Sequence, residues 1–94
     1  MTLQAEGILR TENDQVRVTE WRFAPGAETG HHRHEYDYVI VPLTAGTMRL
    51  LGPAGEASAT LSPGVSYFRQ AGVEHNVINT GSEVLAFVEV ELKR

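Results

Sequence analysis

The chain has 94 residues, a net charge of −4 and a sequence pI of about 5.5, and this length predicts a single domain over residues 1–94. The acidic balance, with basic residues scattered singly apart from Lys93 and Arg94, argues against a nucleic-acid partner. Cysteine is absent, which excludes disulfides, thiolate metal sites and a cysteine nucleophile.

The N-terminal residues contain no basic region followed by an apolar run, and no apolar segment approaches the length of a membrane span. We therefore expect a cytoplasmic protein with no membrane partner. In so small a domain the surface outweighs the interior. Without disulfides, a metal or an oligomer would be the remaining source of additional stability.

Short strands separated by turns are the pattern of the whole chain. Glycine or proline interrupts it about every ten residues, which leaves no helix candidate of ordinary length. This spacing is typical of an antiparallel sandwich or a double-sheet jelly roll, so we expect an all-β fold of about eight to ten short strands. In chain order, the expected strands are residues 8–10, 16–23, 31–34, 36–42, 47–51, 57–61, 65–68, 76–78 and 84–92.

The last expected strand is apolar on both faces in its first half, with Leu85 and Phe87 on one face and Val84, Ala86 and Val88 on the other. One face would form the core, and the other would form a subunit interface or lie under a loop. Because unpaired strand edges favour association, we expect a homodimer. Its interface would use strands near one terminus and the face of Leu85 and Phe87.

Two histidines, His32 and His34, follow a Pro25-Gly26 turn. Residues two apart in a strand point to the same face, so these imidazoles can reach one point, as two ligands of a metal would. The other histidines are His31, which is out of phase with the pair, and the distant His75. Whether His75 folds back onto the pair therefore decides the functional interpretation.

This constellation resembles the two motifs of the cupin family, whose members are small jelly-roll barrels. The first family motif is a glycine, His-x-His, a glutamate and a closing glycine, and it is matched here by Gly26, His32, His34 and Gly46. The second is matched by Gly64, Gly72, His75 and Asn79, with Gln70 where the family has proline. The resemblance implies a cupin-type double-stranded β-helix in which His32, His34 and His75 bind one divalent metal. The alternative is a cupin without metal, in which hydrogen bonds satisfy the three imidazoles.

The glutamate of the first motif has no counterpart, because counting from either side places it at Tyr38 or Val39. Asp37 is the expected substitute, since in a regular strand it shares a face with Val39. Glu35 is the next candidate, although by alternation it points outward unless a bulge intervenes. The metal would be held by three histidines and Asp37, or by three histidines and water. Asp37 would otherwise serve in a turn or orient an imidazole.

Other polar residues are candidates for the wall of a pocket. Arginine suits carboxylates and tyrosine offers a hydroxyl at the end of an apolar ring, but such residues are also common at strand surfaces. Tyr38 is one tyrosine of this kind. The remaining candidates are Tyr36, Arg49, Tyr67 and Arg69.

Imidazole ligands accept Fe, Mn, Ni, Cu, Co or Zn without choosing among them. Three or four protein ligands leave open positions, as in catalytic sites. Iron would suit dioxygenase chemistry, which the family includes, whereas the other ions would suit an isomerase, lyase or hydrolase. We therefore expect a metal-dependent, oxygenase-like enzyme acting on a small organic acid. The alternative is a non-catalytic cupin that binds a small molecule as a sensor, storage or accessory protein.

Residues 36–44 also resemble small stand-alone bacterial cupins, some of which are associated with amino-acid breakdown, including that of β-alanine. This resemblance implies a metabolic role in amino-acid breakdown but does not identify a substrate, because one fold supports many activities.

Overall fold

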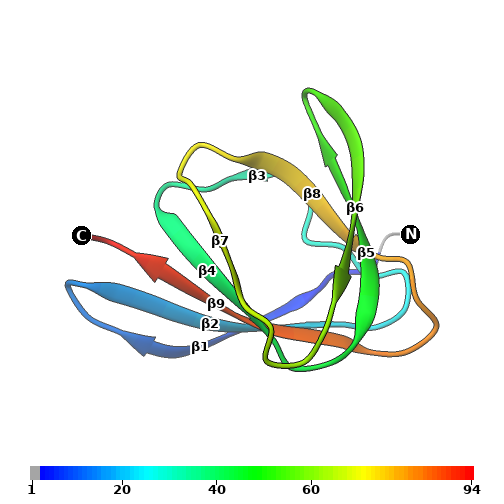
Figure 1. The fold of residues 1–94 in the computed structure, drawn as a ribbon, viewed down its shortest axis with the longest axis horizontal. Coiled ribbons are helices and arrows are strands. Elements are labelled where there is room, and N and C mark those ends of the chain that lie inside the picture. The colour runs from blue at the N-terminus through cyan, green and yellow to red at the C-terminus, as the bar shows by residue number, and fades with distance from the viewer. Residues whose placement is uncertain (1–2) are drawn as a thin grey trace.

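The computed structural model describes residues 3–94, which form nine strands in two antiparallel sheets (Figure 1). One sheet has the order β1-β2-β9-β4-β7 and the other the order β3-β8-β5-β6. The expected all-β jelly roll, a double-stranded β-helix, is confirmed. The strands are β1 (Glu6–Glu12), β2 (Val16–Phe23), β3 (His32–Arg33), β4 (Asp37–Pro42), β5 (Gly46–Gly52), β6 (Gly55–Leu61), β7 (Tyr67–Arg69), β8 (Glu74–Asn79) and β9 (Leu85–Leu92).

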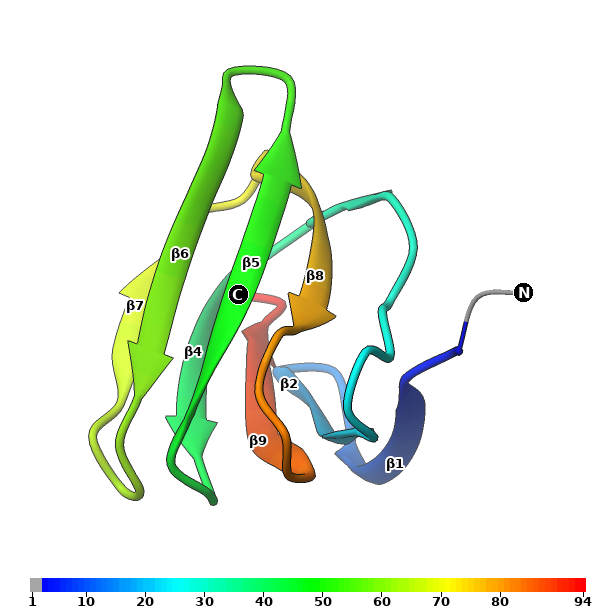
Figure 2. The same cartoon turned by 90° about the vertical axis from the view of Figure 1, so that its right-hand side faces the viewer.

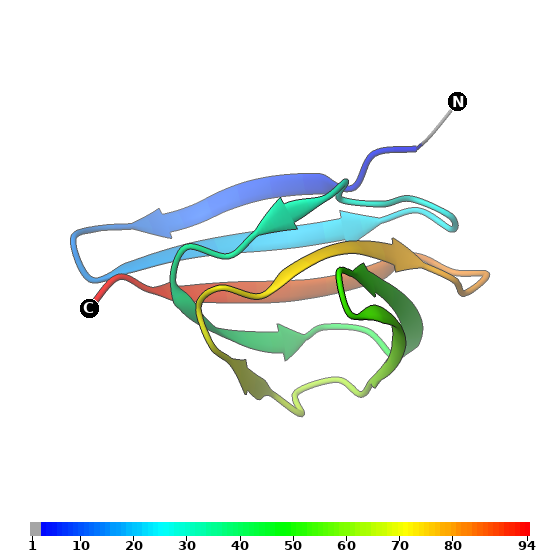
Figure 3. The same cartoon turned by 90° about the horizontal axis from the view of Figure 1, so that it is seen from above.

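The two sheets face each other, with β3 and β8 lying over β2 and β9 (Figures 1 and 3). The β5–β6 hairpin extends beyond the rest of the barrel (Figure 2). Side chains that point between the sheets therefore share one interior, whichever sheet they come from. The described residues contain no helix that could cross a membrane.

Each expected strand has an observed counterpart, and β2 has the expected bounds. The largest difference is β1, which is longer than residues 8–10 because it pairs with β2 from Glu6 to Glu12. The Asn13 side chain supports the intervening turn, since its Oδ1 accepts the backbone N–H groups of Gln15 and Val16 at 2.8 and 2.9 Å. Pairing across this hairpin extends a segment whose own composition is weak for a strand.

Pro-Gly pairs make two of the turns that bring the sheets together. Gly26 has φ +82° and Gly64 has φ +78°, values that glycine adopts without the steric cost of a Cβ atom. A backbone hydrogen bond closes each four-residue turn, from Ala27 N–H to Ala24 O at 2.9 Å in one and from Val65 N–H to Ser62 O at 3.0 Å in the other.

The core lies between the sheets and includes Phe23, Ile40 and Met48. Leu85 and Phe87 belong to it, with 1% and 4% of their surfaces exposed. The expectation that these two residues form a subunit interface is therefore wrong. β9 is the central strand of its sheet, between β2 and β4, and its Leu85–Phe87 face packs into the core.

Candidate metal centre

The pairing of β3 with β8 brings the first two histidines together. His32 is the cross-strand partner of His75, so both imidazoles stand on the same face of the sheet. Their rings are edge to face, with centroids 4.7 Å apart. His75 thus folds back onto the pair, as the second motif predicts.

His34 lies just beyond the end of β3, where backbone hydrogen bonds continue the ladder. Its N–H donates to Val73 O at 2.8 Å, and its carbonyl accepts Gly72 N–H at 2.8 Å. These bonds keep the alternation of side chains, so His34 turns to the same side as His32. His34 is the most buried of the three histidines, with 7% of its surface exposed, and its ring stacks on Tyr38 with centroids 3.9 Å apart.

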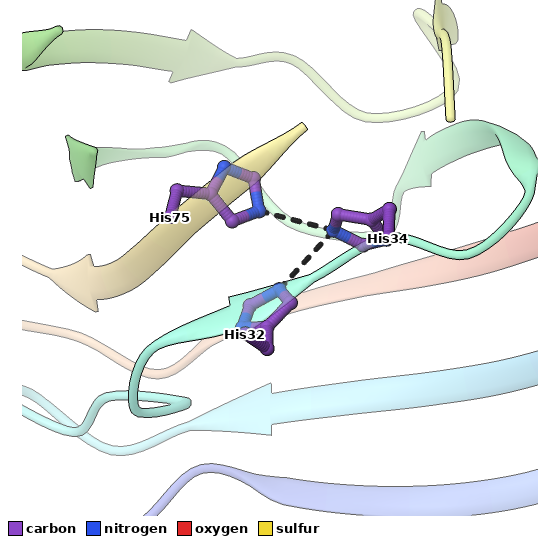
Figure 4. A group of neighbouring side chains, drawn as sticks. All are labelled: His32, His34 and His75. Atoms are coloured by element: carbon purple, nitrogen blue, oxygen red, sulfur yellow. Dashed lines mark hydrogen bonds between the residues drawn. The ribbon is translucent and has the colours of Figure 1, made fainter. Parts of the chain in front are cut away.

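The three imidazoles converge through their Nε2 atoms (Figure 4). His34 Nε2 lies 3.1 Å from His32 Nε2 and 3.0 Å from His75 Nε2. One ligand atom from each ring lies within 4.8 Å of those of the other two. His34 is therefore the centre of the group.

Burial keeps the imidazoles of His34 and His75 neutral at neutral pH. Desolvation, followed by the neighbouring His32, lowers the pKa of His34 to about 4, and the same two causes lead in lowering the pKa of His75 to about 4. A neutral imidazole has one N–H and one lone pair. His34 Nε2 can thus form one straight hydrogen bond, although it faces two nitrogens.

The hydrogen on His32 is directed away from the group. His32 Nδ1 lies 3.0 Å from Gly30 O, which can only accept a hydrogen bond. In the neutral ring this leaves the lone pair on Nε2, facing His34. The Nε2 lone pair of His32 is therefore available to a cation bound between the rings.

The spacing of the nitrogens also fits a metal ion. Two nitrogens that each lie about 2.0–2.1 Å from an ion, at an angle between about 90° and 110°, are about 2.8–3.4 Å apart. The contacts of 3.1 and 3.0 Å fall in this range. The third pair, His32 and His75, has its ligand atoms within 4.8 Å of each other. Three imidazoles grouped in this way are a donor set that suits a borderline divalent ion.

Comparison with known proteins agrees with this architecture. The family model of the cupin domain matches residues 19–91. The chain belongs to the cupin family. A curated relative, "Beta-alanine degradation protein BauB" of Pseudomonas aeruginosa, is 58% identical over 90 residues, which cover 96% of this cupin and 95% of that protein.

Solved structures of cupins share the fold. A cupin domain from Bordetella pertussis is 49% identical and superposes with a TM-score of 0.97, covering all of this chain and 98% of that one. A Klebsiella pneumoniae protein with a double-stranded β-helix domain has a TM-score of 0.79 at 22% identity, with 96% of this chain and 77% of that one covered. The second likeness concerns the fold alone.

The structure does not bring Asp37 to the three histidines of this cupin. On β4 the side chains of Tyr38 and Ile40 point inward, so the alternate position Asp37 is exposed. Its Oδ1 accepts the N–H of Ala71 at 2.8 Å, which anchors the loop before His75. Asp37 therefore supports a turn, which is the alternative to metal binding given for it above.

Two residues next to the histidine pair, Glu35 and His31, also lie outside the group of converging ligand atoms. Glu35 is exposed and lines the mouth of the barrel, whereas His31 is exposed with its Nε2 3.0 Å from Glu74 Oε1. Neither belongs to the set of converging ligand atoms in the described residues.

The carboxylate that does approach the histidines is Glu89 of β9, which sequence reasoning missed. It is 8% exposed, its Oε1 accepts the indole N–H of Trp21 at 3.1 Å, and its Oε2 lies 3.7 Å from His34 Nδ1. Burial, followed by the negative charge of Glu91, raises the pKa of Glu89 to about 7. The sequence signal was the alternation in β9, because Glu89 lies two residues after Phe87 and shares its inward face.

The histidines line a cavity of about 420 Å³ between the two sheets. Its wall is apolar around Ile40, Met48 and Val77, and it also carries the charged side chains of Arg33 and Arg69. Among the pocket candidates, Tyr67 and Arg69 line the cavity together with Tyr38. Tyr36 and Arg49 do not line it: Arg49 pairs with Glu56 on the projecting hairpin, and Tyr36 lies under Arg17.

Proposed function

We propose that this cupin is a metal-dependent enzyme that acts on a small organic acid, with one divalent ion held by His32, His34 and His75. The observation that carries the proposal is the convergence of three Nε2 atoms at the wall of a cavity large enough for a small molecule. When bound, the ion would offer open positions to substrate and to dioxygen or water. Iron would favour oxygenase chemistry.

Two arginines at the cavity support an acidic substrate. In the described part of the chain, the arginines Arg33 and Arg69 form no ion pair with a carboxylate, and both line the cavity. Arg69 lies over the Tyr67 ring, 4.6 Å from its centroid. A guanidinium without a carboxylate partner can bind one from a ligand with two parallel hydrogen bonds.

The chain's own residues would orient that substrate. Arg69 would hold the carboxylate while the apolar wall of Ile40 and Met48 excludes water from the bound molecule. Burial raises the pKa of Tyr67, so its hydroxyl stays protonated and can donate a hydrogen bond to a bound oxygen atom. These roles require no nucleophilic side chain.

The relative named for β-alanine degradation supports a role in the breakdown of small amino acids or of acids derived from them. This proposal concerns the substrate class, namely short-chain carboxylic acids. A cytoplasmic location stays a prediction for this chain.

Metal analysis of untagged protein, purified without chelators, tests the proposed function. We expect about one iron, manganese, nickel, copper, cobalt or zinc ion per chain, before or after reconstitution. Iron-loaded protein should then consume oxygen with a short-chain acid or thiol acid, and other ions should support conversion visible by NMR. Metal without turnover would favour the non-catalytic binding protein, and no metal after reconstitution would overturn the metal site.

Replacement of Arg69 by alanine should weaken binding of an acid selected in that screen by about 10- to 100-fold, as loss of a charged hydrogen bond does. The matched control is Arg49→Ala, which removes a guanidinium outside the cavity. The dissociation constant is measured by calorimetry. Equal effects of the two substitutions would show that only net charge matters.

We also propose a homodimer that uses β1. This strand lies at an edge of its sheet and is exposed except at Ile8, so its unpaired backbone groups can pair with a second chain. Light scattering after size exclusion should give a dimer at micromolar concentration, and Leu9→Lys, at a residue 58% exposed, should shift it toward monomer. Val65→Lys, away from β1, is the control. A monomeric wild type would rule the proposal out.

A further inference from the structure

Glu89 lies behind His34, on the side of the imidazole that faces away from the other two histidines. Its Oε2 is 3.7 Å from Nδ1, whereas the contacts to His32 and His75 are made by Nε2. The two ring nitrogens point in different directions. Glu89 is therefore placed to act on His34 and not as a further ligand beside it.

The carboxylate of Glu89 is buried with little compensation for its charge. Its hydrogen bond from Trp21 comes from a neutral indole, at 3.1 Å. Arg17, whose positive charge acts on Glu89, is engaged by Glu91 through two hydrogen bonds of 2.8 and 2.7 Å. A buried carboxylate without a cation is unfavourable, so a positive charge near His34 would stabilise it.

We propose that Glu89 is a positioning residue of the metal centre, accepting the Nδ1 hydrogen of His34 when His34 Nε2 binds a divalent cation. The cation in turn supplies the positive charge that the buried carboxylate lacks. This inference rests on the proposed metal site. It assigns the carboxylate of this centre to β9 of the opposite sheet, rather than to the strand that follows His34.

The present separation of 3.7 Å is longer than a hydrogen bond. A cation at Nε2 withdraws electron density from the ring and makes Nδ1–H a stronger donor, so the contact shortens on metal binding. Tyr38, stacked on the His34 ring at an interplanar angle of 20°, limits motion out of the ring plane. Motion of the ring within its own plane leaves the stacking intact.

This arrangement gives Glu89→Gln two opposite effects. The amide retains an acceptor for Trp21 but removes the charge, so the metal-free protein should unfold at an equal or higher temperature. Metal affinity should fall by about 10- to 100-fold, as it does when partners behind a ligand are lost. A purely structural role for Glu89 would lower the unfolding temperature and leave affinity unchanged.

Competition of Zn²⁺ and Co²⁺ between the protein and a coloured chelator measures the affinities. The matched control is Glu91→Gln, which removes the same charge from the same face of β9 but does not contact His34, and its affinity should stay within about twofold of wild type. If Glu89→Gln does not fold, Glu89→Asp retains the charge, withdraws the oxygen from Nδ1 and should also weaken binding.

Nitrogen NMR of His34 gives a readout that does not depend on affinity. In the Zn²⁺-loaded wild type we expect Nδ1 to carry a hydrogen whose proton resonance lies far downfield, and this resonance should move upfield in Glu89→Gln. Equal Zn²⁺ affinity in wild type and Glu89→Gln, or an unprotonated His34 Nδ1, would overturn the role of Glu89 but not the proposed metal site. A wild type that binds neither ion would overturn the proposed metal site as well.

Discussion

His75→Ala is expected to lose stoichiometric metal while the barrel stays folded. The substitution removes one of three converging ring nitrogens, and His34 Nε2 then keeps a single contact, to His32 at 3.1 Å. Affinity should fall by more than about 100-fold, because even partners behind the ligands contribute about 10- to 100-fold. Metal content after gel filtration, measured by mass spectrometry, checks this result.

The fold should survive because backbone pairing, not the imidazole, holds β8 in place. Residues on both sides of His75 pair with β3 and β5, and the ring is only partly buried. We expect the free energy of unfolding of the metal-free protein to change by about 1 kcal/mol or less. His31→Ala is the matched control, since that exposed ring contacts Glu74 and lies outside the group. Retained stoichiometric metal in His75→Ala would mean that the second motif is misread.

The strands and the pair of His32 and His34 could be predicted because both follow from local rules. Pro-Gly pairs mark turns wherever they occur, and alternation assigns His32 and His34 to one face of a strand. The approach of His75 is a long-range contact that no local rule gives. It was predictable here through the spacing of two motifs, and the direct pairing of His32 with His75 accounts for it.

Glu89 could not be found because the face of β9 was assigned wrongly. An interface formed by Leu85 and Phe87 implies that Glu89, on the same face of the strand, also points away from the interior of the barrel. The burial of Leu85 and Phe87 in the core reverses that assignment. Alternation in one strand separates its two faces but does not say which of them points into the barrel. On β4, too, the faces differ from the expectation, because Asp37 points outward and Tyr38 points inward.

The buried Asn79, at the other end of β8 from His75, should control stability instead of metal binding. It is 1% exposed, and its Nδ2 donates to Phe23 O at 3.1 Å and to Glu83 O at 2.9 Å. Its Oδ1 accepts the N–H of Gly81 at 2.9 Å. One side chain thus joins the end of β2 to the loop that leads into β9.

Asn79→Ala should therefore lower the free energy of unfolding by about 3 kcal/mol, because each buried group left without a partner costs about 1–3 kcal/mol. That is a large share of the about 5–15 kcal/mol that typically stabilises a domain. Urea unfolding of the metal-free protein measures the change. Asn13→Ala, which removes an exposed side chain from a turn, is the control and should cost about 1 kcal/mol or less.

Measurements of metal affinity and of stability should therefore distinguish the roles of the two motif residues of β8. Asn79 lies four residues from His75, about 13 Å along a strand, so Asn79→Ala should bind metal with wild-type affinity at temperatures where it is folded. His75→Ala should show the reverse, with normal stability and no metal. A loss of metal affinity in folded Asn79→Ala would mean that the loop after β8 also positions the histidines, and that stability and metal binding share one network in this barrel.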